Sequence, residues 1–195
     1  MTIGVLALQG AFREHICMIQ RCGVDAAAVR LPQQLDRVDG LVIPGGESTT
    51  IAKLLVEYGF CDAIRTLASL GKPILGTCAG AILLAGRQDG VPQDFLDLVD
   101  IDITRNAYGR QVDSRETPVT LSFSDQEPFN AIFIRAPIIT RIGTHVVTLS
   151  AYRDRVILAQ QDNLLVSTFH PELTADTRIH RYFLDMVRRH CLRSV

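Results

Sequence analysis

One cysteine stands in a setting that favours nucleophilic chemistry. Cys78 lies between Gly76 and Gly80, after the run 72–75 (KPIL) and before the helix-prone run 81–85 (AILLA). This order predicts a strand, a sharp turn and a helix, with Cys78 at the turn, as in a nucleophile elbow. The glycines allow the strand and helix to approach closely, and a helix N-terminus stabilises a thiolate. The motif predicts covalent catalysis through a thioester, although most free cysteines are packing residues.

A histidine and a carboxylate supply the groups that such a thiol needs. His170, Pro171 and Glu172 follow the apolar run 164–169. Histidine can take the thiol proton and later protonate a leaving amine, and a carboxylate on its other nitrogen fixes the ring. The proline helps to place Glu172 against that ring. Alone the motif is a common strand-ending turn, but the strands of a parallel sheet end at one crevice, where we expect His170 to meet Cys78.

A glycine-rich segment, 44–50 (PGGESTT), is the third motif. It lacks the Gly-Lys-Ser/Thr of a phosphate loop, so a nucleotide site is a poor interpretation. A strand, two glycines and a helix start instead present backbone N–H groups to an anion. An ordinary glycine turn with Ser48 or Thr49 as helix cap is the alternative, but it leaves Glu47 unexplained.

The elements that must position these motifs alternate between strand and helix in the first half of the chain. Apolar runs predict strands at 3–8, 26–29 and 41–43 and another before Cys78. Three helices are predicted between them. Their apolar faces carry Phe12, Ile16 and Ile19, then Ile51, Leu54, Leu55 and Tyr58, then Ile64 and Leu67. This alternation indicates a parallel sheet covered on both faces.

The second half is richer in short strands. The alternation over 99–104 predicts a half-exposed strand, and further strands are expected at 119–123, 131–134 and 146–150. A hairpin over 155–169 and a final helix over about 179–187 complete the pattern. We expect one mixed α/β domain over 1–195, a three-layer structure whose mostly parallel central sheet is flanked by helices, with added antiparallel strands in the second half.

Composition excludes several classes of function. With 195 residues, 21% charged residues and a net charge of −1, nothing indicates a nucleic-acid binder or a polybasic membrane surface. The five cysteines are scattered without a C-x-x-C pair, so neither a disulfide framework nor a thiolate zinc site is expected. The sequence begins with a strand rather than a signal peptide and has no membrane-spanning run. We expect a cytoplasmic protein without metal or cofactor.

Taken together, the three motifs resemble those of the class I, or triad, glutamine amidotransferases. The resemblance narrows to the glutaminase subunits of pyridoxal 5′-phosphate synthase in four segments: 4–11 (GVLALQGA), 46–50 (GESTT), 105–114 (RNAYGRQVDS) and 133–137 (FIRAP). It runs from Thr2 to the C-terminal helix. It implies the flavodoxin-like fold of that class.

The resemblance also implies roles for individual residues. Cys78 would attack the carboxamide of L-glutamine to give a γ-glutamyl thioester, with His170 as base and acid and Glu172 orienting it. Backbone N–H groups of Gly46 and Ala79 would bind the oxyanion. The residues implied in glutamine binding are Gly46, Glu47, Ser48, Arg105, Ile134 and Arg135. Either arginine could pair with the α-carboxylate of glutamine, the alternative being a solvated surface side chain.

A partner follows from the same resemblance. Ammonia would pass to a separate synthase (lyase) subunit, which combines it with a pentose phosphate and a triose phosphate. We expect a large hetero-oligomer with one glutaminase per synthase chain. The Gln9-Gly10 turn would lie near that interface and rearrange on docking to complete the oxyanion hole, so the free subunit is expected to be a poor glutaminase.

Some features depart from the family or leave other interpretations open. Tyr108 replaces the usual phenylalanine, the segment 87–97 is weakly similar, and His15 is expected to have a surface or capping role. Rival functions are the glutaminase for imidazole glycerol phosphate synthesis, a cysteine hydrolase or redox chaperone, and a binding module with a vestigial pocket. The segment 109–114 argues against the first rival, and His170 with Glu172 argues against the others.

Overall fold

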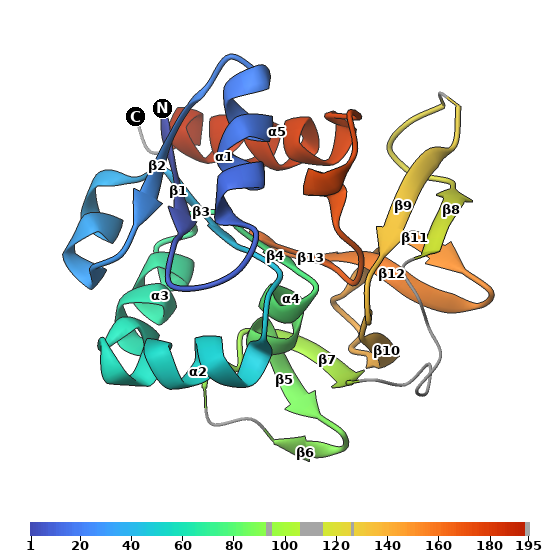
Figure 1. Ribbon diagram of the computed structural model, residues 1–195, viewed down its shortest axis with the longest axis horizontal. Helices are drawn as coiled ribbons and strands as arrows, with labels where there is room; N and C mark the ends of the chain where they lie inside the picture. The colour runs from blue at the N-terminus through green and yellow to red at the C-terminus, as the bar shows by residue number, and fades with distance from the viewer. Residues whose placement is uncertain (93–94, 106–114, 126, 194–195) are drawn as a thin grey trace.

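A seven-stranded sheet forms the centre of the computed structural model, which describes residues 1–92, 95–105, 115–125 and 127–193. Its strands lie in the order β11 (Val147–Tyr152), β12 (Arg155–Gln161), β13 (Leu164–Ser167), β4 (Ile74–Thr77), β3 (Gly40–Ile43), β1 (Thr2–Leu6) and β2 (Asp25–Val29). The five strands from β13 to β2 run parallel, whereas β12 pairs antiparallel with both β13 and β11. The predicted mostly parallel sheet is confirmed (Figure 1).

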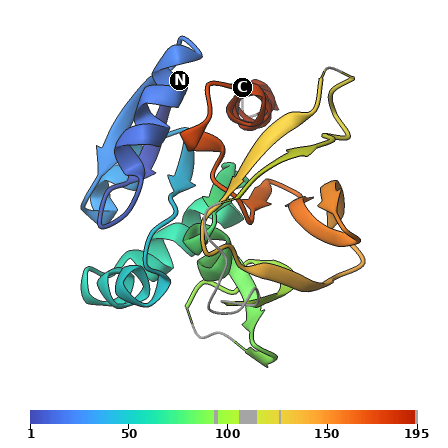
Figure 2. The same cartoon turned by 45° about the vertical axis from the view of Figure 1, so that its right-hand side comes forward.

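Helices cover both faces of this sheet (Figures 1 and 2). One face carries α1 (Phe12–Arg21) and α5 (Arg178–Arg193), and the other carries α2 (Ser48–Glu57), α3 (Phe60–Ser69) and α4 (Ala79–Leu84). Two 3₁₀ helices, η1 (Pro32–Arg37) and η2 (Pro171–Leu173), complete the helical elements of the described residues. Side chains of each central strand point alternately into the hydrophobic cores on the two faces of the sheet. In β3, Leu41 and Ile43 lie in one core and Val42 lies in the other. The three-layer prediction is confirmed.

Two smaller sheets are built from strands between residues 85 and 142. One has the order β10 (Ile138–Ile142), β7 (Val99–Thr104), β5 (Ala85–Gln88) and β6 (Val91–Pro92), and the other pairs β8 (Arg115–Val119) with β9 (Phe129–Phe133). The expected strand at 119–123 is wrong. Strand β8 ends at Val119 because the chain then turns, with the Ser124 N–H donating to the Leu121 carbonyl at 3.1 Å.

The predicted helical faces pack inward, with additions. In α1, Phe12, Ile16 and Ile19 pack against one core, and His15 and Met18 are buried beside them. Tyr58 is half exposed at the end of α2, which stops where Gly59 takes a left-handed backbone conformation with φ of 71°. In the part of the chain that the structure describes, every helix is too short or too polar to cross a bilayer.

Candidate active site

Cys78 occupies the sharp turn between β4 and α4. Its backbone has φ of 49° and ψ of −102°, a conformation that a non-glycine residue rarely adopts. The Cys78 N–H donates to the Ser167 carbonyl of the neighbouring strand at 2.8 Å, which fixes the turn. A Cβ on Gly80 would overlap the Ile43 carbonyl oxygen, so the helix can start this close to the sheet only with glycine there. The result is the strand, turn and helix that the motif predicts.

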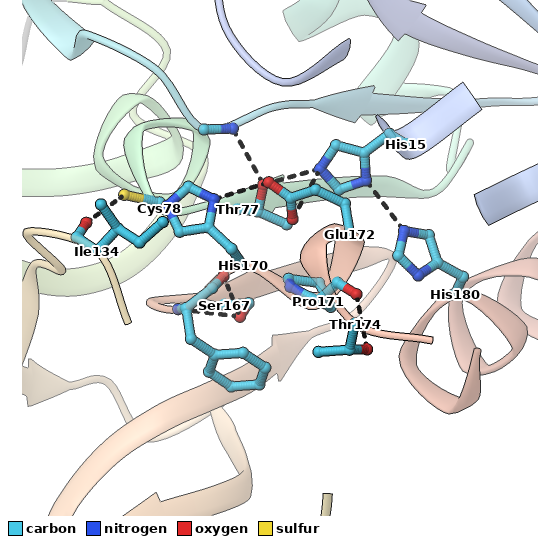
Figure 3. Close-up of polar contacts among 12 residues, drawn as sticks. His15, Thr77, Cys78, Ile134, Ser167, His170, Pro171, Glu172, Thr174 and His180 are labelled. Atoms are coloured by element: carbon cyan, nitrogen blue, oxygen red, sulfur yellow. Dashed lines mark hydrogen bonds and ion pairs between the residues drawn. The ribbon is translucent and has the colours of Figure 1, made fainter. Parts of the chain in front are cut away.

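His170 and Glu172 are placed by the end of β13 and by η2 (Figure 3). The His170 N–H donates to the Ile132 carbonyl of β9 at 2.8 Å. Pro171 starts the 3₁₀ turn, which folds the Glu172 side chain back so that its Oε1 lies 2.7 Å from His170 Nδ1. His170 is 8% exposed and Glu172 4%, so this hydrogen bond is shielded from water. The second ring nitrogen of His170 is left for Cys78.

Opposing effects set the protonation of this pair. Burial alone would lower the pKa of His170, but the hydrogen bonds and charges of Cys78 and Glu172 outweigh it and raise the pKa to about 10. Burial would raise the pKa of Glu172, but the charges that His15 and His170 can carry, with the His170 hydrogen bond, lower it. The site therefore favours an ionised Glu172 and a protonated His170 beside the sulfur.

The protonation of His170 gives a direct test. In an NMR titration, we expect the His170 ring of the wild-type protein to stay protonated to about pH 9, because its pKa is raised to about 10. In Cys78→Ala its pKa will fall, because the sulfur's hydrogen bond and charge are gone. His170→Gln identifies the signal. A His170 that titrates near its ordinary value in both proteins would contradict this electrostatic account.

A cavity of about 350 Å³ opens at the Cys78 sulfur. The predicted site residues that line it are Gln9, Gly10, Gly46, Glu47, Ser48, Cys78, Ala79, Arg105, Ile134, Arg135 and His170. Glu172 lies behind His170 and does not line the cavity. The Cys78 thiol points toward the Ile134 carbonyl, 3.9 Å away. The structure thus gathers the residues of all three motifs around one cavity.

The two arginines predicted to bind the α-carboxylate of glutamine lie in different surroundings. Arg105 is half-buried, and its N–H donates to Asp89 Oδ1 at 3.3 Å. Arg135 is exposed and has a left-handed backbone, with φ of 44°. Both arginines border the cavity. Residues 106–114, which include Tyr108 and the segment 109–114, lie outside the described residues, as do 93–94 within the segment 87–97.

Glu47, rather than Ser48 or Thr49, caps α2. Its carboxylate accepts hydrogen bonds from the N–H groups of Thr49 at 3.2 Å and Thr50 at 2.7 Å, and from the Thr50 hydroxyl at 2.7 Å. The Thr49 and Thr50 hydrogen bonds lower the pKa of Glu47 to about 2. The alternative of a Ser48 or Thr49 cap is therefore wrong, because the longer Glu47 side chain reaches the same N–H groups. This accounts for the glutamate that an ordinary glycine turn left unexplained.

Removing the cap will destabilise the protein. Glu47→Gln keeps one acceptor oxygen but loses the negative charge and the second acceptor. We therefore expect it to lower the free energy of unfolding by up to about 1 kcal/mol at neutral pH. The pKa of Glu47 is lower in the folded state than its ordinary 4.5, so its contribution is present above pH 4.5 and lost as the pH falls toward about 2. Urea unfolding at several pH values measures the difference.

The matched control is Glu57→Gln at the other end of α2. A carboxylate is unfavourable at a helix C-terminus, so this change should not destabilise the protein. A Glu47→Gln protein as stable as wild type at neutral pH would contradict the capping role.

The Gln9-Gly10 turn rests on the glycine-rich segment. Gln9 Oε1 accepts the Glu47 N–H at 2.8 Å, and the Ala11 N–H donates to the Gly45 carbonyl at 3.0 Å. Gly10 has φ of 102° and packs so closely on the Gly45 carbonyl oxygen that a Cβ would overlap it. The turn therefore contacts Gly46, one of the two predicted oxyanion donors, through the Gln9 side chain.

The sequence interpretation missed three polar residues behind the site. His15, Thr77 and His180 are buried, and the expected surface or capping role of His15 is wrong. A signal was available, because His15 lies at helical spacing from Met18, Ile19 and Cys22, and His180 from Phe183, Leu184 and Val187. Both histidines therefore belong to the inward faces of α1 and α5.

Comparison with solved structures defines the class of protein that has this fold and site. A crystal structure described as a glutamine amidotransferase superposes with a TM-score of 0.88 at 44% sequence identity, covering 95% of this chain and 98% of that chain. A Thermoplasma acidophilum protein assigned as part of a GMP synthase, 18% identical, shares the fold with a TM-score of 0.72, covering 100% of this chain and 97% of that one. The fold is that of the glutamine amidotransferases.

Sequence comparison identifies the family within this class. The model of the SNO glutamine amidotransferase family matches residues 5–189, and the chain belongs to that family. It is 50% identical to the pyridoxal 5′-phosphate synthase subunit PdxT of Desulforamulus reducens over 188 residues, 96% of this chain and 100% of that protein. It is also 50% identical to PdxT of Thermosipho africanus over 189 residues, 97% and 100% of the two chains.

Proposed function

We propose that this protein is the glutaminase subunit of a pyridoxal 5′-phosphate synthase, and that it hydrolyses L-glutamine to L-glutamate and ammonia. The observation that carries the proposal is the hydrogen-bonded pair of His170 and Glu172 beside Cys78, at the end of a cavity bordered by two arginines. Membership of the SNO family and relatives named PdxT over nearly the whole chain support it.

The proposed reaction begins with the formation of a thioester. The Cys78 thiolate attacks the carboxamide carbon of glutamine, and a C–S bond forms while the carbonyl oxygen becomes an oxyanion. The N–H groups of Gly46 and Ala79 bind that oxygen, an interaction that commonly contributes a few kcal/mol. The tetrahedral intermediate collapses as the C–N bond breaks, and protonated His170 gives its proton to the leaving ammonia.

Hydrolysis of the thioester completes the cycle. His170, now neutral, takes a proton from a water molecule, which attacks the γ-glutamyl carbon and displaces the Cys78 thiolate. Glu172 stays ionised throughout and holds His170 by its Nδ1. Glutamate then leaves, and the thiolate and protonated His170 are restored.

Glutamine binding is assigned to the residues that line the same cavity. Arg105 or Arg135 would pair with the α-carboxylate, while Gly46, Ser48 and Ile134 would border the side chain. The Glu47 carboxylate already accepts several hydrogen bonds from the start of α2. We therefore assign Glu47 an indirect part in binding, through the shape of the glycine-rich segment.

The assembly and the location are also proposals. The chain would act as one domain over 1–195 and deliver ammonia to the synthase subunit within a large hetero-oligomer, one glutaminase per synthase chain. The five cysteines are free thiols, which suits the reducing cytoplasm. Docking would move the Gln9-Gly10 turn, which now contacts Gly46, and so complete the oxyanion hole.

Glutamate release from glutamine tests this function, measured with and without the synthase subunit. We expect slow release by the free protein and strong stimulation by the synthase subunit. Equally fast release in both conditions would contradict the rearrangement of the Gln9-Gly10 turn and the synthase partner, but it would leave the glutaminase activity supported. Absence of release in both would overturn the proposed function.

A further inference from the structure

A cluster of buried polar side chains lies behind Glu172, on the side away from the cavity (Figure 3). His15 on α1 and His180 on α5 are both completely buried. His15 Nδ1 lies 3.0 Å from His180 Nε2, and His15 Nε2 lies 3.1 Å from Thr77 Oγ1 and 3.3 Å from Glu172 Oε2. Buried polar groups cost free energy unless they interact well, so this cluster requires an explanation that packing alone does not supply.

The neighbours assign the ring protons of His15. Glu172 Oε1 is taken by His170, and Oε2 is buried and makes no hydrogen bond within the described residues apart from its close approach to His15 Nε2. A carboxylate oxygen would be repelled by an unprotonated ring nitrogen at this distance. His15 Nε2 therefore carries the hydrogen, which lies between Thr77 Oγ1, its hydrogen-bond partner at 3.1 Å, and Glu172 Oε2 at 3.3 Å. His15 Nδ1 then accepts the hydrogen of His180 Nε2.

The second histidine agrees with this assignment. His180 Nδ1 is buried and has no hydrogen-bond partner in the described part of the chain. With its hydrogen on Nε2, His180 leaves only a lone pair unsatisfied, whereas the opposite tautomer would leave a buried N–H donor without an acceptor. The order of donation runs from His180 to His15 and from His15 toward Glu172.

Both histidines behind the site are neutral near neutral pH. Burial lowers the pKa of His15, and His170 lowers it further, against the opposing charges of Glu172 and Glu14. Burial and then His15 lower the pKa of His180 to about 3, with Glu172 opposing. A neutral donor at His15 binds the carboxylate but leaves the negative charge of Glu172 to stabilise the His170 imidazolium.

The same ring also connects to the glycine-rich segment. Thr77 Oγ1, which lies 3.1 Å from His15 Nε2, accepts the Gly45 N–H at 3.1 Å. Gly45 in turn packs against the His170 ring so closely that a Cβ would overlap Cε1. His15 therefore lies at the junction of the carboxylate and the segment that carries the predicted oxyanion donor.

We propose that His15 is a positioning residue for the glutaminase reaction, whose protonated Nε2, hydrogen-bonded to Thr77, faces the second oxygen of Glu172 and so keeps the carboxylate aligned on His170. The proposal rests on the proposed function, since it concerns the same site. His180 fixes the tautomer of His15, because the hydrogen bond at one ring nitrogen decides which nitrogen carries the hydrogen. This role extends the triad by one buried residue from α1.

Two amide substitutions separate this role from simple packing. The side-chain nitrogen of His15→Gln reaches the place of Nε2, whereas that of His15→Asn reaches only the place of Nδ1. Both variants are neutral and polar, so they differ mainly in the donor toward Glu172. His145→Asn, in an exposed turn, is the matched control for replacing a histidine.

The test uses the full chain, alone and with the synthase subunit. In the complex, kcat for glutamate release should fall about 10- to 100-fold in His15→Asn, the range for lost partners of metal-binding histidines, with little change in KM. In the free protein, alkylation of Cys78 by iodoacetamide should require a higher pH, because a weakened Glu172 stabilises the His170 imidazolium less. His15→Gln should stay within about threefold of wild type, as should His145→Asn.

The outcomes separate the two proposals. Wild-type behaviour of His15→Asn in both kcat and the alkylation profile would overturn the role of His15. Equal impairment of His15→Gln and His15→Asn would also overturn it, because the donor at Nε2 would then not be the property that matters. If the wild-type complex releases no glutamate, the proposed function fails. The alkylation profiles of the free proteins then still decide whether His15 supports the pair of Cys78 and His170.

Discussion

Glutamine hydrolysis by the complex will fall by a factor on the order of 10⁴ or more when Cys78 is replaced by alanine. The sulfur is the atom that forms the covalent bond, and no other cysteine lines the described cavity. Alanine retains the Cβ and meets the same backbone strain at φ of 49°, so the fold should survive. Glutamate release, with thermal unfolding as a check on folding, measures the effect.

The matched control is Cys61→Ala on α3. Cys61 is partly buried away from the cavity, and burial raises the pKa of its thiol, so it is a poor nucleophile. We expect this variant to hydrolyse glutamine at the wild-type rate. Residual hydrolysis above about 1% of wild type in Cys78→Ala would contradict the thioester mechanism.

Gly45→Ala is expected to cost about 100-fold or more in kcat, the second largest effect. A Cβ on Gly45 would overlap Cε1 of the His170 ring and approach the Cys78 Cβ to 3.3 Å. The backbone cannot move away freely, because its N–H donates to Thr77 Oγ1 at 3.1 Å and its carbonyl accepts the Ala11 N–H at 3.0 Å. The His170 ring must shift, and a displacement of about 1 Å can cost about 100-fold.

Steady-state kinetics in the complex measure this prediction, with Gly90→Ala as control. Gly90 lies in the turn between β5 and β6, where a Cβ would meet no heavy atom within 4 Å, although its φ of 79° makes alanine slightly unfavourable. We expect Gly90→Ala to keep the wild-type kcat. A folded Gly45→Ala enzyme with wild-type kcat would show that His170 does not depend on the position seen in the structure.

The central sheet and the two main motifs were accessible from the sequence for a physical reason. Buried parallel strands are short apolar runs, and the turns after them carry glycine or proline, so Cys78 after β4 and His170 after β13 stand out locally. Parallel strands bring their ends to one edge, so the meeting of the two motifs could be predicted as well.

The remaining parts depend on contacts that no local pattern encodes. His15 and His180 are 165 residues apart, and only the packing of α1 against α5 brings their rings together. The role of Glu47 as a cap arises from side-chain reach, which the usual preference for Ser or Thr at that position conceals. Strand β8 ends at a turn that the apolar residues beyond Val119 did not reveal.

Covalent labelling of the complex by a glutamine analogue with a diazoketone in place of the carboxamide tests the central claim most directly. Peptide mapping by mass spectrometry would locate the bond. We expect one label, on Cys78, with excess glutamine protecting and Cys78→Ala unlabelled. A label on another residue, or a wild-type complex that hydrolyses glutamine yet takes up no label, would contradict the account.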